Sequence, residues 1–233
     1  MAPYPNDRRS LQLPDTTLTA APPRPSLRGW SHLATVPLAI AGAIALVAVS
    51  GGNVARQISL AIYGVCLILL FSVSASYHRG PWSMKTRRVW GRLDHATIFL
   101  AIAGTYTPVG LIALRGTLQQ VVLGIVWSGA ALAIVLKLIW VRAPKWLSVV
   151  LAIALGWVGV AAMPQVLAHE GVAAVVLLAC GGLAYTLGAI VYARRRPDPI
   201  PHVFGYHELF HAFTLVAVAC QYVAIAFFVV RVD

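Results

Sequence analysis

Two histidines one helical turn apart stand at the start of the last apolar segment of the chain. His207 and His211 have i,i+4 spacing, so on a helix both imidazoles project from one face. Ser74 and His78 share this spacing at the end of an earlier apolar segment, and Asp94 precedes the next one. Catalytic zinc sites commonly use three protein ligands and leave the fourth position to water. The pattern therefore predicts a metal centre with His78, His207 and His211 as ligands.

The chemistry that this set allows is hydrolysis. Neutral imidazole suits zinc, and zinc lowers the pKa of a bound water to about 7. Asp94 can hold that water or orient a ligand, and Ser74 lies one turn deeper than His78. Simpler roles remain open, because Asp94 can cap the helix that follows it and Ser74 can hydrogen-bond the carbonyl one turn back. A histidine-rich set without a redox signature favours zinc over other divalent ions.

The segments that carry these residues are typical of membrane helices. The chain has 233 residues, of which 59% are hydrophobic and 11% charged, and its mean hydropathy is +0.79. Soluble domains carry about 25% charged residues. Continuous apolar runs that can cross a hydrocarbon core about 30 Å thick indicate helices. We expect an all-α, integral membrane bundle of seven transmembrane helices, at 33–50, 57–77, 95–114, 119–141, 146–168, 172–193 and 207–230.

Basic residues set the expected orientation of the bundle. Fourteen lysines and arginines lie on the side of the N-terminal tail, and three lie on the other side. By the positive-inside rule the N-terminus is cytoplasmic and the C-terminus external, in a multi-pass protein of the cell membrane. The net charge of +11 is then an orientation signal, so the expected partner is the lipid bilayer and not nucleic acid. The same orientation brings the serine, the aspartate and the three histidines to the cytoplasmic boundary.

The chain divides into a tail and one membrane domain. Residues 1–28 are rich in proline, threonine and arginine and lack an apolar core. They predict a disordered cytoplasmic tail rather than a cleaved signal peptide. Residues 29–233 form the predicted seven-helix domain. We expect His32, His95 and His202 to be structural or interfacial residues.

A rival interpretation uses the glutamate between the two histidines. "HELFH" matches the H-E-x-x-H pattern of zinc proteases, in which the glutamate is the general base. An intramembrane protease would still need a third ligand from upstream, and His78 is the best-placed candidate. With His78 and Asp94 included, the site has its ligands and a carboxylate without Glu208. Because Glu208 points about 100° away from His207 on a helix, we expect it to pair with one of Arg194–Arg196.

Taken together, three motifs resemble the hemolysin III family. They are Ser74-x3-His78, the run "DHATIFLAIAGTYTP" from Asp94, and His207-x3-His211. The family comprises bacterial relatives of the progestin and adipoQ receptors, among them the adiponectin receptors, and is similar to the membrane hydrolases that include alkaline ceramidases. The likeness covers residues 29–230 with the motifs in order.

The resemblance implies a seven-helix bundle with a cytoplasmic N-terminus and zinc near the cytoplasmic surface. It implies that His78, His207 and His211 bind the metal, that Asp94 contacts it through water, and that Ser74 lies beside the site.

We therefore expect a zinc-dependent hydrolase of an amide or ester bond in a lipid-like substrate. Asp94 would position the water and accept its proton, and Ser74 would hydrogen-bond the developing oxyanion or Asp94. One alternative is a non-enzymatic sensor or regulator of the membrane, in which zinc joins the second and seventh helices. Another is a pore-forming cytolysin, which only the family name suggests. The sequence specifies neither the substrate nor the oligomeric state.

Overall fold

All the regular secondary structure is helical within the residues that the computed structural model describes, 25–140 and 144–230. No β-strand occurs among them, only an isolated bridge between Ile200 and Phe204. The prediction of an all-α protein is confirmed; most of the predicted disordered tail, residues 1–28, lies outside the described residues. The α-helices are α1 (Trp30–Ala48), α2 (Val54–Arg79), α3 (Met84–Pro108), α4 (Gly116–Ile139), α5 (Lys145–Trp157), α6 (Met163–Arg194) and α7 (Tyr206–Ala224). Short π-helices, η1 (Val109–Ala113) and η3 (Ile225–Val229), continue α3 and α7, and the 3₁₀-helix η2 (Val158–Ala162) joins α5 to α6.

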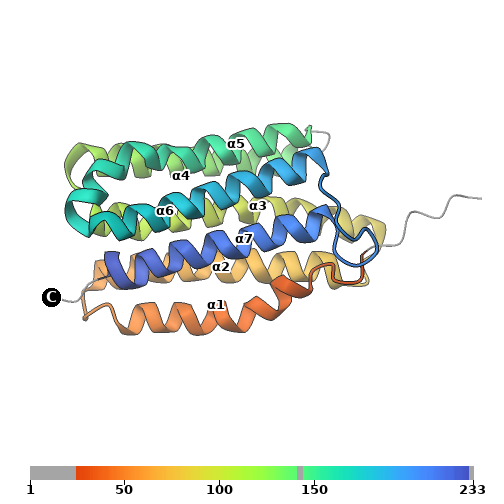
Figure 1. Cartoon of the computed structure of the whole chain (residues 1–233), viewed down its shortest axis with the longest axis horizontal. Helices are drawn as coiled ribbons and strands as arrows, with labels where there is room; N and C mark the ends of the chain where they lie inside the picture. Colours follow the sequence, from red (N-terminus) through yellow and green to blue (C-terminus); the bar gives the residue numbers. More distant parts are fainter. Residues whose placement is uncertain (1–24, 141–143, 231–233) are drawn as a thin grey trace, which may run out of the picture.

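The helices lie side by side in one bundle (Figure 1). Each contacts its neighbours in sequence, and α7 contacts α1, so these contacts form a closed ring. The helices α2 and α3 are the most deeply buried, whereas α1 and α4 are the least buried. The chain enters α1 at one end of the bundle and leaves η3 at the opposite end.

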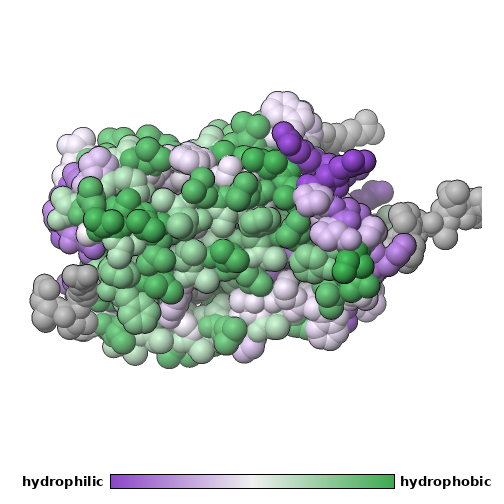
Figure 2. Space-filling model, in the orientation of Figure 1, coloured by the Kyte–Doolittle hydropathy of each residue, from purple (hydrophilic) through white to green (hydrophobic). Residues whose placement is uncertain are grey.

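The bundle has the surface of a membrane protein. Six helical segments of the described chain are long and apolar enough to cross a membrane. The longest, Trp146–Arg194, includes α5, η2 and α6, and inside it Gly171 has φ 84° and ψ 178°, outside the helical region. This break falls between the predicted helices 146–168 and 172–193. Figure 2 shows hydrophobic residues across the middle of the bundle and polar residues gathered at the end where α1 begins.

The third helix begins earlier than predicted. α3 begins at Met84, with Ser83 as its N-cap: the Ser83 hydroxyl accepts a hydrogen bond from the backbone N–H of Thr86 at 3.3 Å. Asp94 therefore lies about three turns inside the helix, and its alternative role as an N-cap is wrong. The first turns of α3 are polar, so a search for apolar runs does not detect them.

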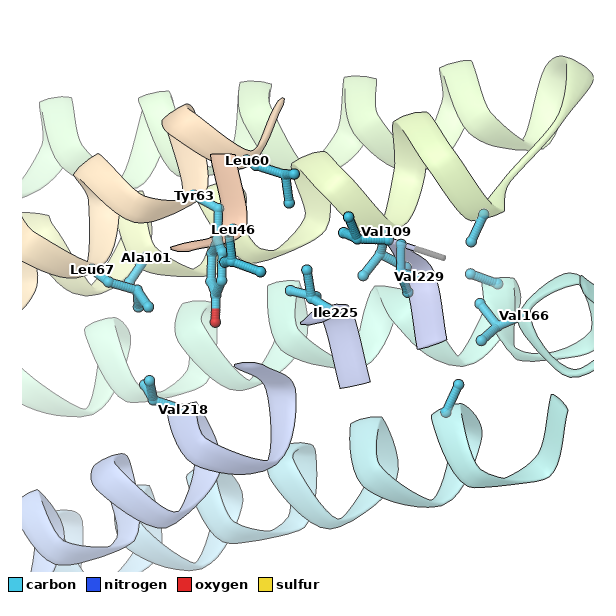
Figure 3. Packing of buried hydrophobic residues seen from close by; sticks show 14 of the residues in the cluster. Leu46, Leu60, Tyr63, Leu67, Ala101, Val109, Val166, Val218, Ile225 and Val229 are labelled. Atoms are coloured by element: carbon cyan, nitrogen blue, oxygen red, sulfur yellow. The ribbon is translucent and has the colours of Figure 1, made fainter. Parts of the chain in front are cut away.

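The apolar packing is concentrated in the half of the bundle where α1 ends and α2 begins. A cluster of buried side chains there joins α1, α2, η1, α6 and η3 (Figure 3), and its members include Leu46, Leu60, Val109, Val166 and Ile225. Their exposed fractions are 7% or less. The side chains in this half pack through apolar contacts. The polar residues of α1, α2, α3 and α7 lie at the other end of the bundle.

Helices α1 and α2 approach closely at a glycine. A Cβ atom at Gly64 would lie 2.4 Å from the Cβ of Ala43, which is closer than two methyl groups can pack. Gly124, in the outer helix α4, has no atom within 4 Å of the same position.

We expect Gly64→Ala to destabilise the protein by about 1–3 kcal/mol, because overpacking forces α1 and α2 apart. Alanine favours a helix over glycine by about 1 kcal/mol, so Gly124→Ala, which has open space around it, should be neutral or stabilising. Thermal unfolding of both variants in detergent checks this. Equal melting temperatures would show that the α1–α2 contact does not limit stability.

Candidate metal centre

Three histidines from two helices converge at the polar end of the bundle. His78 lies in the last turn of α2, and His207 and His211 lie one turn apart at the start of α7. The Nε2 atoms of His78 and His207 are 3.1 Å apart, and one ring nitrogen from each of the three residues lies within 4.8 Å of the others. The predicted ligand set is thus assembled in space, from positions separated by 129 residues in the sequence.

The geometry and chemistry of the three rings fit a divalent metal ion. Ligand nitrogens of a tetrahedral zinc, at Zn–N distances of about 2.0–2.1 Å, are about 3.3 Å apart. The separations of 3.1 to 4.8 Å are close enough for small ring rotations to reach that value. His211 is 2% exposed, and its Nδ1 has no hydrogen-bond partner among the described residues. Imidazole ligands suit zinc, and also copper, nickel and cobalt.

Asp94 and Ser74 lie beside the histidines. The Asp94 Oδ2 atom is 3.9 Å from His78 Nε2, and both side chains are buried. This separation is longer than a hydrogen bond, so the carboxylate faces the His78 ring without bonding to it directly. The Ser74 hydroxyl lies near the Asp94 carboxylate, and both side chains line the same cavity as the histidines.

A fourth histidine lies in the site, which the sequence interpretation did not anticipate. His32, in the first turn of α1, is 2% exposed and stacks on His211 with ring centroids 3.9 Å apart and an interplanar angle of 5°. His95 behaves as expected of a structural residue: its nitrogens contact the carbonyl of Gly91 at 2.7 Å and the hydroxyl of Tyr192 at 3.3 Å. One feature of the sequence could have indicated this position: His32 is predicted at the same depth in the membrane as His78, His207 and His211.

Glu208 is engaged away from the histidines. Its Oε2 accepts a hydrogen bond from the backbone N–H of Gly205 at 3.0 Å, which caps α7, and its Oε1 pairs with the guanidinium of Arg28. The expectation of a partner among Arg194–Arg196 is wrong. The partner comes from the N-terminal segment, 180 residues away in the sequence, which no local pattern can indicate.

The segment from Pro25 to Gly29 closes this end of the bundle. Ser26 and Leu27 donate backbone hydrogen bonds to the carbonyls of His202 (3.0 Å) and Val203 (3.2 Å) in the loop before α7. At Gly29 the chain has φ 78°, and a Cβ there would lie 2.6 Å from the Cβ of His78. The segment therefore packs directly against His78 of the histidine cluster.

A cavity of about 510 Å³ adjoins the histidine cluster. At one end it is lined by the polar site: Ser74, His78, Asp94, His207 and His211. Along the rest of its length apolar side chains of α3, α5 and α6 form the wall, among them Ile98, Ile102, Ile153, Leu178 and Leu183. An apolar cavity with polar groups at one end is the usual form of a site for a small amphiphilic ligand.

Comparisons with known proteins agree with this architecture. A family model described as haemolysin-III related matches residues 21–222. The chain is 34% identical over 175 residues to a hemolysin-3 homolog of Bacillus subtilis, covering 75% of this chain and 79% of that protein. It is 32% identical over 178 residues to hemolysin-3 of Bacillus cereus, covering 76% and 78%. A more distant relative is the human monocyte to macrophage differentiation factor, 26% identical over 174 residues, covering 73% and 70%.

Gly29 offers a test of how tightly the N-terminal segment fits the site. We expect Gly29→Ala to lower the melting temperature, because the new Cβ collides with His78 in addition to straining a positive φ. Gly52→Ala is the matched control, since Gly52 has φ 76° but no atom within 4 Å of a Cβ. Thermal unfolding in detergent should show a clearly larger loss for Gly29→Ala. Equal losses would mean that only backbone strain matters at this position.

Proposed function

We propose that this chain, which belongs to the haemolysin-III-related family, is a metal-dependent membrane hydrolase of an amide or ester bond in a lipid-like substrate. One observation carries the proposal: the cluster of His78, His207 and His211 lies beside Asp94 at the polar end of an apolar cavity of about 510 Å³. A metal centre, a carboxylate and space for an acyl chain are the parts that such a reaction needs.

In this proposal His78, His207 and His211 hold the metal, and zinc is the favoured ion for an all-imidazole set. A bound zinc supplies Lewis acidity and lowers the pKa of a water molecule to about 7. His78 and His211 are buried and His207 is half-buried, and all three line the cavity.

The remaining groups of the site take the proton and orient the reacting atoms. Asp94, beside the Ser74 hydroxyl, accepts a proton from the attacking water and orients that water. Ser74 has a single O–H group, so it donates either to the Asp94 carboxylate or, once Asp94 carries the proton, to the oxyanion that forms when the carbonyl is attacked. The apolar wall of α3, α5 and α6 aligns the acyl chain so that its carbonyl lies at the polar end.

The orientation in the membrane is part of the proposal. We place the N-terminus in the cytoplasm and the C-terminus outside, with seven crossings. The support is threefold: the break at Gly171 divides the longest segment, the chain begins and ends at opposite ends of the bundle (Figure 1), and the basic residues favour the N-terminal side. The site then faces the inner leaflet.

A second candidate function is a metal-stabilised membrane sensor or regulator. It is favoured by one observation: the ligands come from α2 and α7, which are not neighbours in the ring, so a metal ion would join them across the bundle. The protease alternative is weaker, because Glu208 pairs with Arg28 and caps α7 instead of facing the histidines. A pore is suggested only by the names of the Bacillus relatives.

Metal content is the first test. We expect about one zinc per purified chain, and at least a tenfold loss of bound metal in His78→Ala and in His207→Ala, because two imidazoles rarely hold zinc. His202→Ala, at an exposed position on the loop before α7, is the matched control and should keep its metal. Elemental analysis of the wild type and the three variants measures the bound metal. A wild-type metal content in His78→Ala or His207→Ala contradicts the assignment of that histidine as a ligand.

Turnover is the second test. We expect purified protein to hydrolyse some member of a panel of N-acyl and O-acyl lipids, and Asp94→Asn to reduce the rate about 10²–10⁴-fold while the metal stays bound. Glu208→Gln makes the same change of charge and should keep turnover, with lower stability. Bound metal without any hydrolysis would favour the sensor. Dye leakage from liposomes that is indifferent to Asp94→Asn would favour the pore.

A further inference from the structure

His32 is buried at the metal centre without a polar partner. Neither Nδ1 nor Nε2 has a hydrogen-bond partner among the described residues, although the side chain is 2% exposed. Its ring stacks on His211 and meets the ring of Phe71 edge-on, with centroids 5.1 Å apart. A buried polar group left unpaired costs about 1–3 kcal/mol. Phenylalanine would pack here as well at lower cost, so packing alone does not account for a histidine.

The cavity is where a partner for this imidazole can lie. His32 lines it at the same polar end as Asp94 and His211. A neutral imidazole offers one donor and one acceptor, and an amide or ester group offers at least an oxygen to match the donor. His95, which also lines the cavity, differs because both of its ring nitrogens already contact protein atoms.

We propose that His32 is a substrate-contacting residue, which hydrogen-bonds the polar head of the amphiphile whose acyl chain fills the cavity. The inference rests on the proposed function, since that function places the head beside the three ligand histidines. It gives α1 a part in recognition, whereas α2 and α7 supply the metal ligands and α3 the carboxylate. The stack on His211 then holds the His32 ring with its edge available to the ligand.

Two substitutions separate this role from a purely structural one. His32→Phe keeps an aromatic ring against His211 and Phe71 but removes both nitrogens. His32→Gln loses the ring but restores a donor and an acceptor. A residue that only packs tolerates the first change better than the second, whereas a residue that hydrogen-bonds a ligand shows the opposite order in affinity. His202→Phe makes the same chemical change at an exposed histidine and serves as the control.

The experiment measures affinity rather than turnover. The probe is dodecanehydroxamic acid, whose head binds metal ions and carries a carbonyl and an N–H, and whose alkyl chain suits the apolar wall. Full-length wild-type protein and the three variants, purified with their metal and placed in lipid nanodiscs, are titrated calorimetrically. We expect His32→Phe to raise Kd about tenfold or more, with metal content unchanged. His32→Gln should recover part of the loss, and His202→Phe should match the wild type.

Each outcome decides the matter. Equal affinity in wild type and His32→Phe, or no binding by the wild type, overturns the proposal. Loss of metal in His32→Phe also overturns it, because His32 would then act through His211. A wild type that binds the hydroxamate but hydrolyses no lipid removes the hydrolase proposal alone. In that case the role of His32 is still tested by the ratio of the hydroxamate Kd of His32→Phe to that of the wild type.

Discussion

The structure depends on one constraint: the hydrocarbon core offers no hydrogen-bonding partners, so every polar side chain buried there must find its own. Within the described residues, the chain meets this constraint for its buried acidic groups by placing them in one polar layer, whereas the His32 ring and the Tyr63 hydroxyl stay without a hydrogen-bond partner. In that layer Glu208 pairs with Arg28, Asp94 lies beside Ser74, and three histidines share one small space. The ring of helices must close for this to happen, because α7 brings two of the histidines and the glutamate to α1, α2 and α3.

The two ends of the bundle are therefore stabilised by different interactions. The end where α1 stops is packed with aliphatic side chains that leave little freedom to the helices. The other end is held by directional interactions, namely the cap on α7, the N-terminal segment hydrogen-bonded to the loop before α7, and the stacked rings. Between them lies the cavity, bounded mainly by the apolar walls of α3, α5 and α6. A rigid end and an ordered polar layer together give the fixed geometry that a metal centre needs.

The sequence predicts those features that local patterns encode. Long apolar runs predict the helices, and i,i+4 spacing places His207 above His211 because both lie on one α-helix. What it does not encode is the rotation of a uniformly apolar helix about its own axis. The first helix is apolar on all sides, so nothing local indicates that His32 faces inward rather than the lipid. Local patterns also fail to predict the partner of Glu208, because that contact joins residues 180 positions apart. They fail to predict the start of α3, because its capping serine lies outside the apolar run.

The protease interpretation and the proposed lipid hydrolase differ in the carboxylate that would act as base. The spatial arrangement distinguishes them, whereas the sequence motif alone does not. "HELFH" contains what a zinc protease needs on one helix, and by spacing alone Glu208 is the nearest acid to both histidines. In the folded chain that carboxylate is committed to the Gly205 N–H and to Arg28. The acid that faces His78 at 3.9 Å is Asp94, from a different helix. Because a general base must lie within reach of the proton that it removes, the proposed hydrolysis would take its base from α3, as Asp94, and not from α7.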